Sequence, residues 1–163
     1  AGFGADLGAE KFIDIKCRSA GIRPSAAVLV ATIRALKFHG GVAREDLSEE
    51  NLPALRAGLA NLNRHINNLR ENYGVPAIVS INQFVADTDA EVELVMEHCK
   101  ALGVQVALSS HWANGGAGAT DLAHMVAEMC DADTTSANTP HNSFVYPGEL
   151  SLWEKLEAVA TKV

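Results

Sequence analysis

Two aromatic residues stand out because of the segments that precede them. Phe84 follows the short apolar run 77–81, and Trp112 follows the apolar run 104–108. Each run is typical of a strand buried on both faces, and parallel α/β sheets bind ligands beyond the carboxyl ends of such strands. Flat side chains at those positions suit the stacking of a planar ring. The alternative for Phe84 is that its ring plugs the top of the sheet, and the sequence leaves open whether the two strands are neighbours.

Groups able to bind polar or anionic parts of a ligand lie near these aromatics. Asn82 offers an amide that both donates and accepts hydrogen bonds. Gly115 and Gly116 permit close backbone approach just before a predicted helix, whose N-terminus favours negative charge. Lys37 and His39 follow another apolar run and are candidates for binding an anion, with a solvated turn as the alternative.

Other kinds of site find little support in the sequence. His124 and Glu128 lie four apart on a predicted helix, but no third ligand accompanies them, so no metal site is predicted. The serines Ser109 and Ser110 precede His111, yet the G-x-S-x-G elbow of hydrolases is absent. No G-x-x-x-x-G-K-[ST] motif occurs, so the sequence predicts no triphosphate site of its own.

Composition narrows the class of protein further. The 163 residues are 48% hydrophobic, which is enough for one globular domain spanning residues 1–163. Thirteen Lys and Arg against twenty Asp and Glu give a net charge of −7, which argues against nucleic-acid binding and anionic membrane surfaces. No apolar run approaches the roughly 20 residues that cross a bilayer. Three widely spaced cysteines fit a reducing, cytoplasmic location rather than a disulfide framework.

The pattern of elements predicts how these residues are positioned. Strands are expected at 26–33, 77–81 and 104–108, with a short fourth at 144–146. An apolar stripe within 51–74 predicts one helix, for which a short coiled coil is the alternative. Capping boxes at Thr88–Glu91 and Ser151–Glu154 each predict the start of another helix. Two more helices are predicted over 6–20 and 121–130. Alternating strands and helices predict an α/β fold, a parallel sheet with helices on both faces, as in P-loop NTPase-like or Rossmann-like three-layer sandwiches.

Several segments together carry a family resemblance. They are 1–12 (AGFGADLGAEKF), 14–18 (DIKCR), 30–37 (VATIRALK), 39–41 (HGG), 61–62 (NL), 65–66 (HI), 82–84 (NQF), 87–88 (DT), 112–113 (WA) and 115–116 (GG). This set resembles formate–tetrahydrofolate ligases, also called formyltetrahydrofolate synthetases, over essentially the whole chain. The resemblance covers only part of a family member.

The resemblance implies a reaction and its partners. The family joins formate to tetrahydrofolate at the expense of ATP, through formyl phosphate, and gives 10-formyltetrahydrofolate. Its members are typically homotetramers that use Mg²⁺ with the nucleotide and respond to a monovalent cation. By resemblance, Phe84, Leu108 and Trp112 line the site for the pteridine-type ring. The family's phosphate-binding loop and the basic residues for formyl phosphate precede residue 1, so this chain alone is expected to be inactive and to bind no cofactor.

Two alternatives and one further expectation remain. The chain could instead be a non-catalytic binding or interaction module with the same fold, or a remnant that survives because its core is complete. The helical segment 1–24 is expected to dock on the rest of the ligase chain. In that case Phe3, Phe12 and Ile13 are expected to be exposed in this chain.

Overall fold

The core of the protein is a three-stranded parallel sheet. The computed structural model describes residues 4–135 and 144–163, with the side chains of 133–135 excepted. The strands, in the spatial order β1-β2-β3, are β1 (Ala27–Ala31), β2 (Ala77–Asn82) and β3 (Gln105–Ser109). Leu29 lies in register with Val79, which in turn lies in register with Val106. The predicted α/β class is confirmed.

Two of the predicted helices form as their sequence patterns require. In α4 (Leu52–Asn67), which continues as the π-helical turn η3 (Asn68–Asn72), the apolar stripe faces the core. The Asn51 side chain caps α4 by accepting the Ala54 N–H at 3.0 Å. In α5 (Asp89–Ala101), Thr88 and Glu91 form the expected capping box.

The C-terminal helix is also capped as predicted. α8 spans Leu152–Lys162, and its capping box joins Ser151 and Glu154. The predicted fourth strand at 144–146 is wrong, because side chains of the first helical segment bind its backbone. The Val145 N–H donates to Asp14 Oδ1 at 2.8 Å, and the Tyr146 carbonyl oxygen accepts from Arg18 Nη2 at 2.6 Å.

The first helical segment runs through α1 (Ala5–Glu10), the π-helical η1 (Lys11–Cys17) and α2 (Arg18–Ala20). Gly21 ends it with a φ of +62°, which favours glycine. The expectation of exposed apolar residues is confirmed for Phe12 and wrong for Ile13, which is buried in the main core. Phe3 lies outside the described residues.

The segment after β1 differs from its prediction. The strand ends at Ala31, and Thr32 caps a helix, α3 (Ile33–His39), by accepting the Ala35 N–H at 3.2 Å. The remaining elements are η2 (Arg44–Asp46), α6 (His111–Asn114), the 3₁₀ helix η4 (Gly115–Ala119) and α7 (Thr120–Thr135). The region expected to be a turn or loop, 34–41, is therefore mostly helical.

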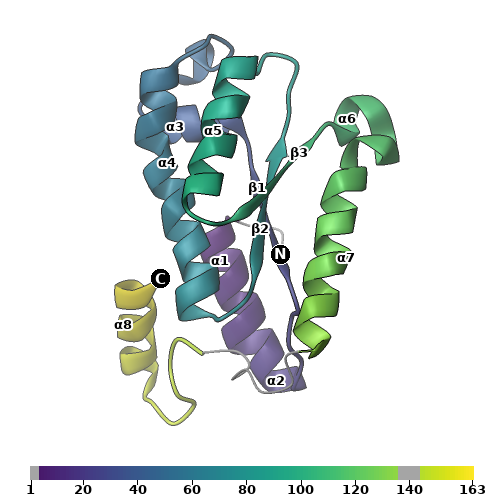
Figure 1. The fold of residues 1–163 in the computed structure, drawn as a ribbon. Coiled ribbons are helices and arrows are strands. Elements are labelled where there is room, and N and C mark those ends of the chain that lie inside the picture. Colours follow the sequence, from purple (N-terminus) through teal and green to yellow (C-terminus); the bar gives the residue numbers. More distant parts are fainter. Residues whose placement is uncertain (1–3, 136–143) are drawn as a thin grey trace.

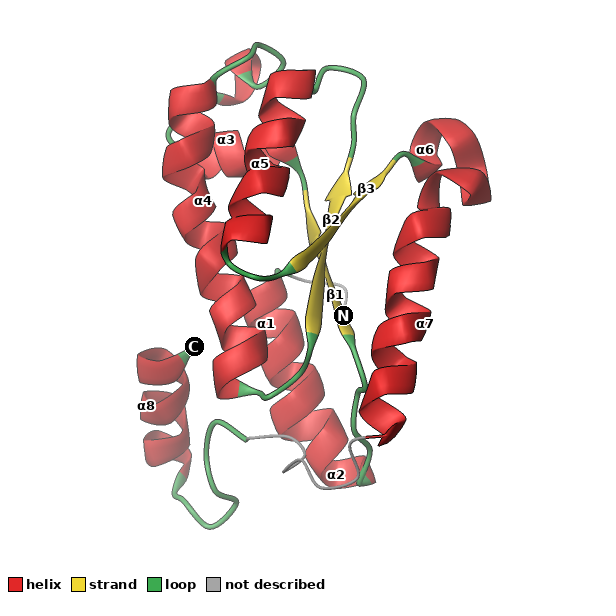
Figure 2. Cartoon of the chain, viewed as in Figure 1, coloured by secondary structure: helices red, strands yellow, loops and turns green. Residues whose placement is uncertain are grey.

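Helices cover the sheet from two sides. Figure 1 shows α3, α4 and α5 on one side of the strands and α7 on the other, and Figure 2 shows the same three-layer arrangement by element type. The carboxyl ends of all three strands point to the end of the sheet that leads into α3 and α6. No helix in the described part of the chain is long and apolar enough to span a membrane.

Candidate functional site

The loops that carry the two predicted aromatics begin side by side. β2 and β3 are hydrogen-bonded neighbours, and Asn82 at the end of one lies in register with Ser109 at the end of the other. The Gln83 N–H then donates to the Ser109 carbonyl oxygen at 3.0 Å. Phe84 and Trp112 therefore leave the same rim of the sheet, which the sequence could not establish.

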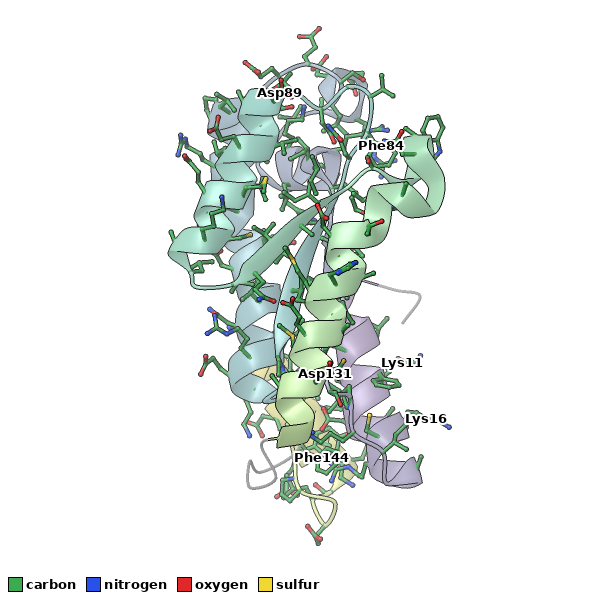
Figure 3. The ribbon with its side chains drawn as sticks, turned by 45° about the vertical axis from the view of Figure 1, so that its right-hand side comes forward. Lys11, Lys16, Phe84, Asp89, Asp131 and Phe144 are labelled. Atoms are coloured by element: carbon green, nitrogen blue, oxygen red, sulfur yellow. The ribbon has the colours of Figure 1, made fainter. Side chains whose placement is uncertain are left out.

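Both rings are accessible at this rim. Phe84 is 38% exposed and Trp112 is 77% exposed, so neither is sealed inside the molecule. Figure 3 shows Phe84 at the end where β2 and β3 lead toward α6. Leu108 is also partly exposed, but its register with Ile81 places it on the sheet face opposite to Asn82.

A tight turn fixes the position of Phe84. Its backbone N–H donates to Asp87 Oδ2 at 2.8 Å, and the Asp87 N–H donates back to the Phe84 carbonyl oxygen at 3.0 Å. Asp87 Oδ1 and Asn82 Oδ1 are buried, with no hydrogen-bond partner among the described residues. Burial raises the pKa of Asp87, although the Phe84 N–H opposes this rise. Two acceptor oxygens thus lie buried beside the turn with their hydrogen-bonding capacity unused.

A cation also approaches Phe84. The Arg34 guanidinium, at the start of α3, lies 6.0 Å from the centroid of the Phe84 ring. That distance is at the outer limit of a cation–π contact. Sequence reasoning singled out neither Arg34 nor Asp87 as a site residue, because both contacts depend on how α3 and the turn fold against each other.

Lys37 has a different role from the one predicted. Its side chain is fully buried, and its Nζ lies 2.8 Å from Glu91 Oε1 and donates to the Glu49 carbonyl oxygen at 2.7 Å. A fully buried lysine held by a buried carboxylate and a backbone carbonyl oxygen is a structural cation, so we do not assign it to an external anion. His39 is exposed at the end of α3, and Figure 1 shows α3 apart from α6, so the structure does not bring Lys37 and His39 together with Gly115 and Gly116.

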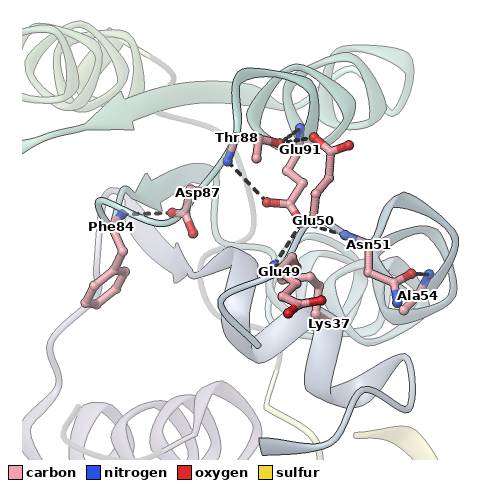
Figure 4. A network of polar contacts seen from close by, with 9 residues as sticks. All are labelled: Lys37, Glu49, Glu50, Asn51, Ala54, Phe84, Asp87, Thr88 and Glu91. Carbon is pink, nitrogen blue, oxygen red and sulfur yellow. Dashed lines mark hydrogen bonds and ion pairs between the residues drawn. The ribbon is translucent and has the colours of Figure 1, made fainter. Parts of the chain in front are cut away.

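Glu91 is the centre of a polar network beside the Phe84 turn (Figure 4). Its carboxylate accepts the Asn51 N–H at 3.0 Å and the Thr88 N–H at 3.2 Å, in addition to Lys37. Burial alone would raise the pKa of Glu91, but the hydrogen bonds from Lys37, Asn51 and Thr88 outweigh it and lower the pKa. One carboxylate therefore joins α3 to the N-terminal caps of α4 and α5.

The glycine-rich segment after Trp112 is folded rather than open. Gly115 has a φ of +59°, and it and Gly116 have empty space where a side chain would lie. Gly118 is the closely packed glycine, because its Cβ would lie 2.6 Å from the Ser110 carbonyl carbon. The Ser110 N–H donates to the Gly118 carbonyl oxygen at 3.0 Å, which closes the segment. Sequence reasoning did not distinguish Gly118 from its neighbours.

The remaining chemical candidates do not form a second site. The Ser109 hydroxyl lies 3.0 Å from His111 Nδ1, but Ser109 is buried and cannot reach a substrate as a nucleophile. Within the described residues, no group of three His, Cys, Asp or Glu side chains could hold a metal ion.

The structure is thus that of a parallel α/β domain with accessible aromatic residues at the carboxyl rim of its sheet. The model of the formate–tetrahydrofolate ligase family matches residues 1–163, and the chain belongs to that family. It is 59% identical over all of its length to the formate–tetrahydrofolate ligase of Methylococcus capsulatus. It is 53% identical to that of Granulibacter bethesdensis and 54% identical to that of Methylibium petroleiphilum. The chain spans 28%, 27% and 29% of these three relatives, respectively.

Proposed function

We propose that this chain supplies the wall that holds the folate ring in an ATP-dependent ligase that joins formate to tetrahydrofolate. The observation that carries the proposal is the placement of Phe84 and Trp112 on adjacent loops at one rim, both accessible to a ligand. Family membership supports this substrate class, because the relatives are named for formate and tetrahydrofolate.

The ring is held by apolar surface and by hydrogen bonds. Phe84 and Trp112 offer flat faces for stacking. Leu108, which the family resemblance also assigns to this site, is partly exposed near the end of β3 but lies on the sheet face opposite to Asn82. We assign the Asn82 amide, at the carboxyl end of β2, to a hydrogen bond with the polar edge of the pterin. Gly115 and Gly116, beside Trp112, leave room for an anionic end of the ligand.

The wall contributes orientation to the reaction. Formate takes the γ-phosphoryl group of ATP to give formyl phosphate and ADP. The N10 amine of the folate then attacks the formyl carbon, the C–O bond to phosphate breaks, and the amine loses a proton. A ring clamped at the rim brings that amine to the acyl carbon, and such positioning is worth several kcal/mol.

Other groups for the reaction belong to the rest of the ligase. The chain has no triphosphate-binding motif, so we assign ATP with its Mg²⁺, the monovalent cation and formyl phosphate to polypeptide outside these 163 residues. The proposal also takes the complete ligase to be a cytoplasmic homo-oligomer. This chain by itself does not catalyse the reaction.

Tryptophan fluorescence tests the folate-ring wall. The chain has two tryptophans, so Trp153→Phe leaves Trp112 as the sole reporter. Titration of this variant with tetrahydrofolate is expected to give saturable quenching, and Trp112→Phe in the parent chain is expected to abolish that response. Quenching that persists without Trp112 contradicts the proposal.

A matched pair of phenylalanine variants sharpens the test in an active enzyme. Residues 1–163 can replace the matching segment of the Methylococcus capsulatus ligase, giving a chimeric ligase. We expect Phe84→Leu to raise the KM for tetrahydrofolate about tenfold, with the KM for ATP unchanged. Phe144→Leu is the control, because Phe144 is 37% exposed, nearly the same as Phe84, but lies against Arg18 far from the rim. Equal effects of the two substitutions, or a change in the KM for ATP alone, contradict the proposal.

A further inference from the structure

His111 lies at the carboxyl rim of the sheet, and a buried hydroxyl holds one of its two ring nitrogens. The residue is exposed at the start of α6, immediately before Trp112, and its Nδ1 lies 3.0 Å from the Ser109 hydroxyl oxygen. Ser109, the last residue of β3, is only 1% exposed. Within the described part of the chain, Ser109 is the only hydrogen-bond partner of the His111 ring. The other ring nitrogen, Nε2, is therefore available to a ligand.

The Ser109 hydroxyl determines which nitrogen of a neutral His111 ring carries the proton. A buried hydroxyl directs its hydrogen to an acceptor, because an unsatisfied donor costs free energy in the interior of a protein. Among the described residues, the acceptor that the structure places within hydrogen-bond distance is His111 Nδ1. The Ser109 O–H therefore donates to Nδ1, and the proton of the neutral ring lies on Nε2.

The neighbouring strand offers a competing acceptor, which the Ser109 hydroxyl does not use. Asn82 lies in register with Ser109 and on the same face of the sheet. If Asn82 Oδ1 accepted the Ser109 hydroxyl, the hydroxyl oxygen could accept a proton from His111 Nδ1, and Nε2 would then be an acceptor. Asn82 Oδ1 makes no hydrogen bond with any described residue, however. His111 thus offers a ligand an N–H donor.

The backbone that carries His111 is also fixed. The Ser110 N–H donates to the Gly118 carbonyl oxygen at 3.0 Å, and the Asn114 side-chain amide donates to the Ser110 hydroxyl oxygen at 3.0 Å. Gly118 packs so closely that a Cβ there would lie 2.7 Å from the His111 backbone nitrogen. The donor is therefore held in place before a ligand arrives, which lowers the entropic cost of binding.

We propose that His111 is a further binding residue of the folate-ring wall, whose Nε2–H donates to the ring carbonyl oxygen of a pterin stacked on Trp112. Ser109 is then the positioning residue that keeps the proton on Nε2. The Cα atoms of His111 and Trp112 are about 3.8 Å apart, so the donor lies beside a ring that stacks on Trp112. The carbonyl oxygen of a pterin lies on the edge of its ring system, whereas the glutamate carboxylates of a folate lie at the far end of its tail. The inference rests on the proposed function, but the position of the proton does not.

Heteronuclear NMR of the histidine rings tests the position of the proton without any ligand. At about pH 8, where an ordinary histidine is neutral, the couplings of the ring nitrogens to the carbon-bound ring protons show which nitrogen is protonated. We expect the Nε2–H form alone for His111, whose signals are assigned by their loss in His111→Leu, and a mixture of both forms in Ser109→Ala. His124, an exposed histidine of α7, is the control that Ser109→Ala leaves unchanged. A proton on Nδ1 in the parent chain, or the same pattern in Ser109→Ala, overturns the inference.

Spectra with ligand test the contact itself. A ring N–H open to water exchanges its proton too fast to be seen, and a hydrogen bond to a ligand slows that exchange. We expect the proton on His111 Nε2 to become visible with tetrahydrofolate, and equally with a methyl-substituted tetrahydropterin, which has the ring but no tail. A proton that appears with tetrahydrofolate alone assigns the donor to the tail carboxylates and overturns the ring contact. A proton that appears with neither, although Trp112 fluorescence shows that tetrahydrofolate is bound, overturns the inference.

Substitutions separate this inference from the proposed function. In the Trp153→Phe chain, we expect His111→Leu to weaken tetrahydrofolate binding about tenfold, measured by Trp112 fluorescence. His111→Gln, whose amide keeps an N–H donor, is expected to bind within about threefold of the chain without it, and His124→Leu is the control that leaves binding unchanged. Equal binding with and without His111→Leu overturns the inference and leaves the folate-ring wall intact. If the chain with His111 shows no quenching, the wall is contradicted and the inference falls with it.

Discussion

Asp87 and Phe84 hold each other through two hydrogen bonds, one in each direction. The Asp87 carboxylate accepts the Phe84 N–H at 2.8 Å, and the Phe84 carbonyl oxygen accepts the Asp87 N–H at 3.0 Å. The ring at the rim is therefore fixed by a residue three positions later, immediately before the Thr88 cap of α5. A change in the Asp87 carboxylate therefore alters the position of the Phe84 ring through the backbone of the turn.

The first prediction concerns this turn. Asp87→Ala removes the acceptor for the Phe84 N–H, so we expect tetrahydrofolate binding, followed by Trp112 fluorescence, to weaken about tenfold. Asp87→Asn keeps a carbonyl oxygen in the same place and is expected to bind more tightly than Asp87→Ala. Circular dichroism checks that both variants fold. If the two substitutions weaken binding equally, the hydrogen bond to Phe84 does not position the ring.

The second prediction concerns the buried ion pair beside this turn, between Lys37 and Glu91. Lys37→Met leaves the Glu91 carboxylate buried without its cation and is expected to lower the free energy of unfolding by about 3–5 kcal/mol. Lys37→Met combined with Glu91→Gln is expected to lose less than Lys37→Met alone. The amide oxygen still accepts one of the two backbone N–H groups that Glu91 binds, and no buried charge remains. Urea denaturation measures both, and a double variant less stable than Lys37→Met contradicts the ion-pair argument.

The third prediction is the pH dependence of the same pair. Burial would raise the pKa of Glu91, but hydrogen bonds from Lys37, Asn51 and Thr88 lower it below its usual value of 4.5. A folded-state pKa below the unfolded value gives stability that is present above about pH 4.5 and is lost as the pH falls through the folded pKa. The stability difference between the parent chain and Glu91→Gln should therefore shrink as the pH falls from 6 to 3. A difference that stays constant over that range excludes Glu91 as the titrating group.

The raised pKa of Asp87 acts in the opposite direction. Burial is its main cause, and the Asp87 carboxyl therefore binds its proton more tightly in the folded chain than in the unfolded chain. Its contribution to stability falls as the pH rises through its pKa values. Comparing Glu91→Gln with the parent chain cancels the part of this contribution that burial causes, because Asp87 is buried in both chains. The part that the Glu91 charge adds to the Asp87 pKa is lost with that charge.

Regular periodicity made most of the fold predictable. The apolar stripe of α4 and the capping boxes of α5 and α8 appear in the structure at the predicted residues. The prediction failed at Thr32, where a β-branched residue at the end of an apolar run was assigned to the strand but caps α3. It failed at 144–146 because the partners of that segment, Asp14 and Arg18, are more than 120 residues away.

The candidate site was predictable only in its outline. Phe84 and Trp112 could be found because each follows a strand, and strand ends gather at one rim. That Lys37 is buried could not be read from the sequence, since its partner Glu91 comes from another helix. Asp87 acts through a turn, and its role depends on hydrogen-bond geometry that residue types alone do not specify.

The last prediction concerns the close contact of α3 with α4, which supports the Arg34 and Lys37 side of the rim. A Cβ on Gly58 would lie 1.9 Å from the Leu36 carbonyl oxygen, a backbone atom that cannot move without displacing α3. Gly58→Ala is therefore expected to lower the free energy of unfolding by about 1–3 kcal/mol or more, measured by urea denaturation.

Gly116→Ala is the control for this prediction, because a Cβ there meets nothing within 4 Å and the backbone does not have a positive φ. It is expected to change the free energy of unfolding by less than about 0.5 kcal/mol. Because α3 carries Arg34 and Lys37, Gly58→Ala should also weaken tetrahydrofolate binding. Gly116→Ala leaves α3 in place, so any effect of it on binding reports on the space beside Trp112 alone. If Gly58→Ala and Gly116→Ala have the same free energy of unfolding, α3 can move away from α4 without loss of stability. The contact between these two helices would then not support the Phe84 turn.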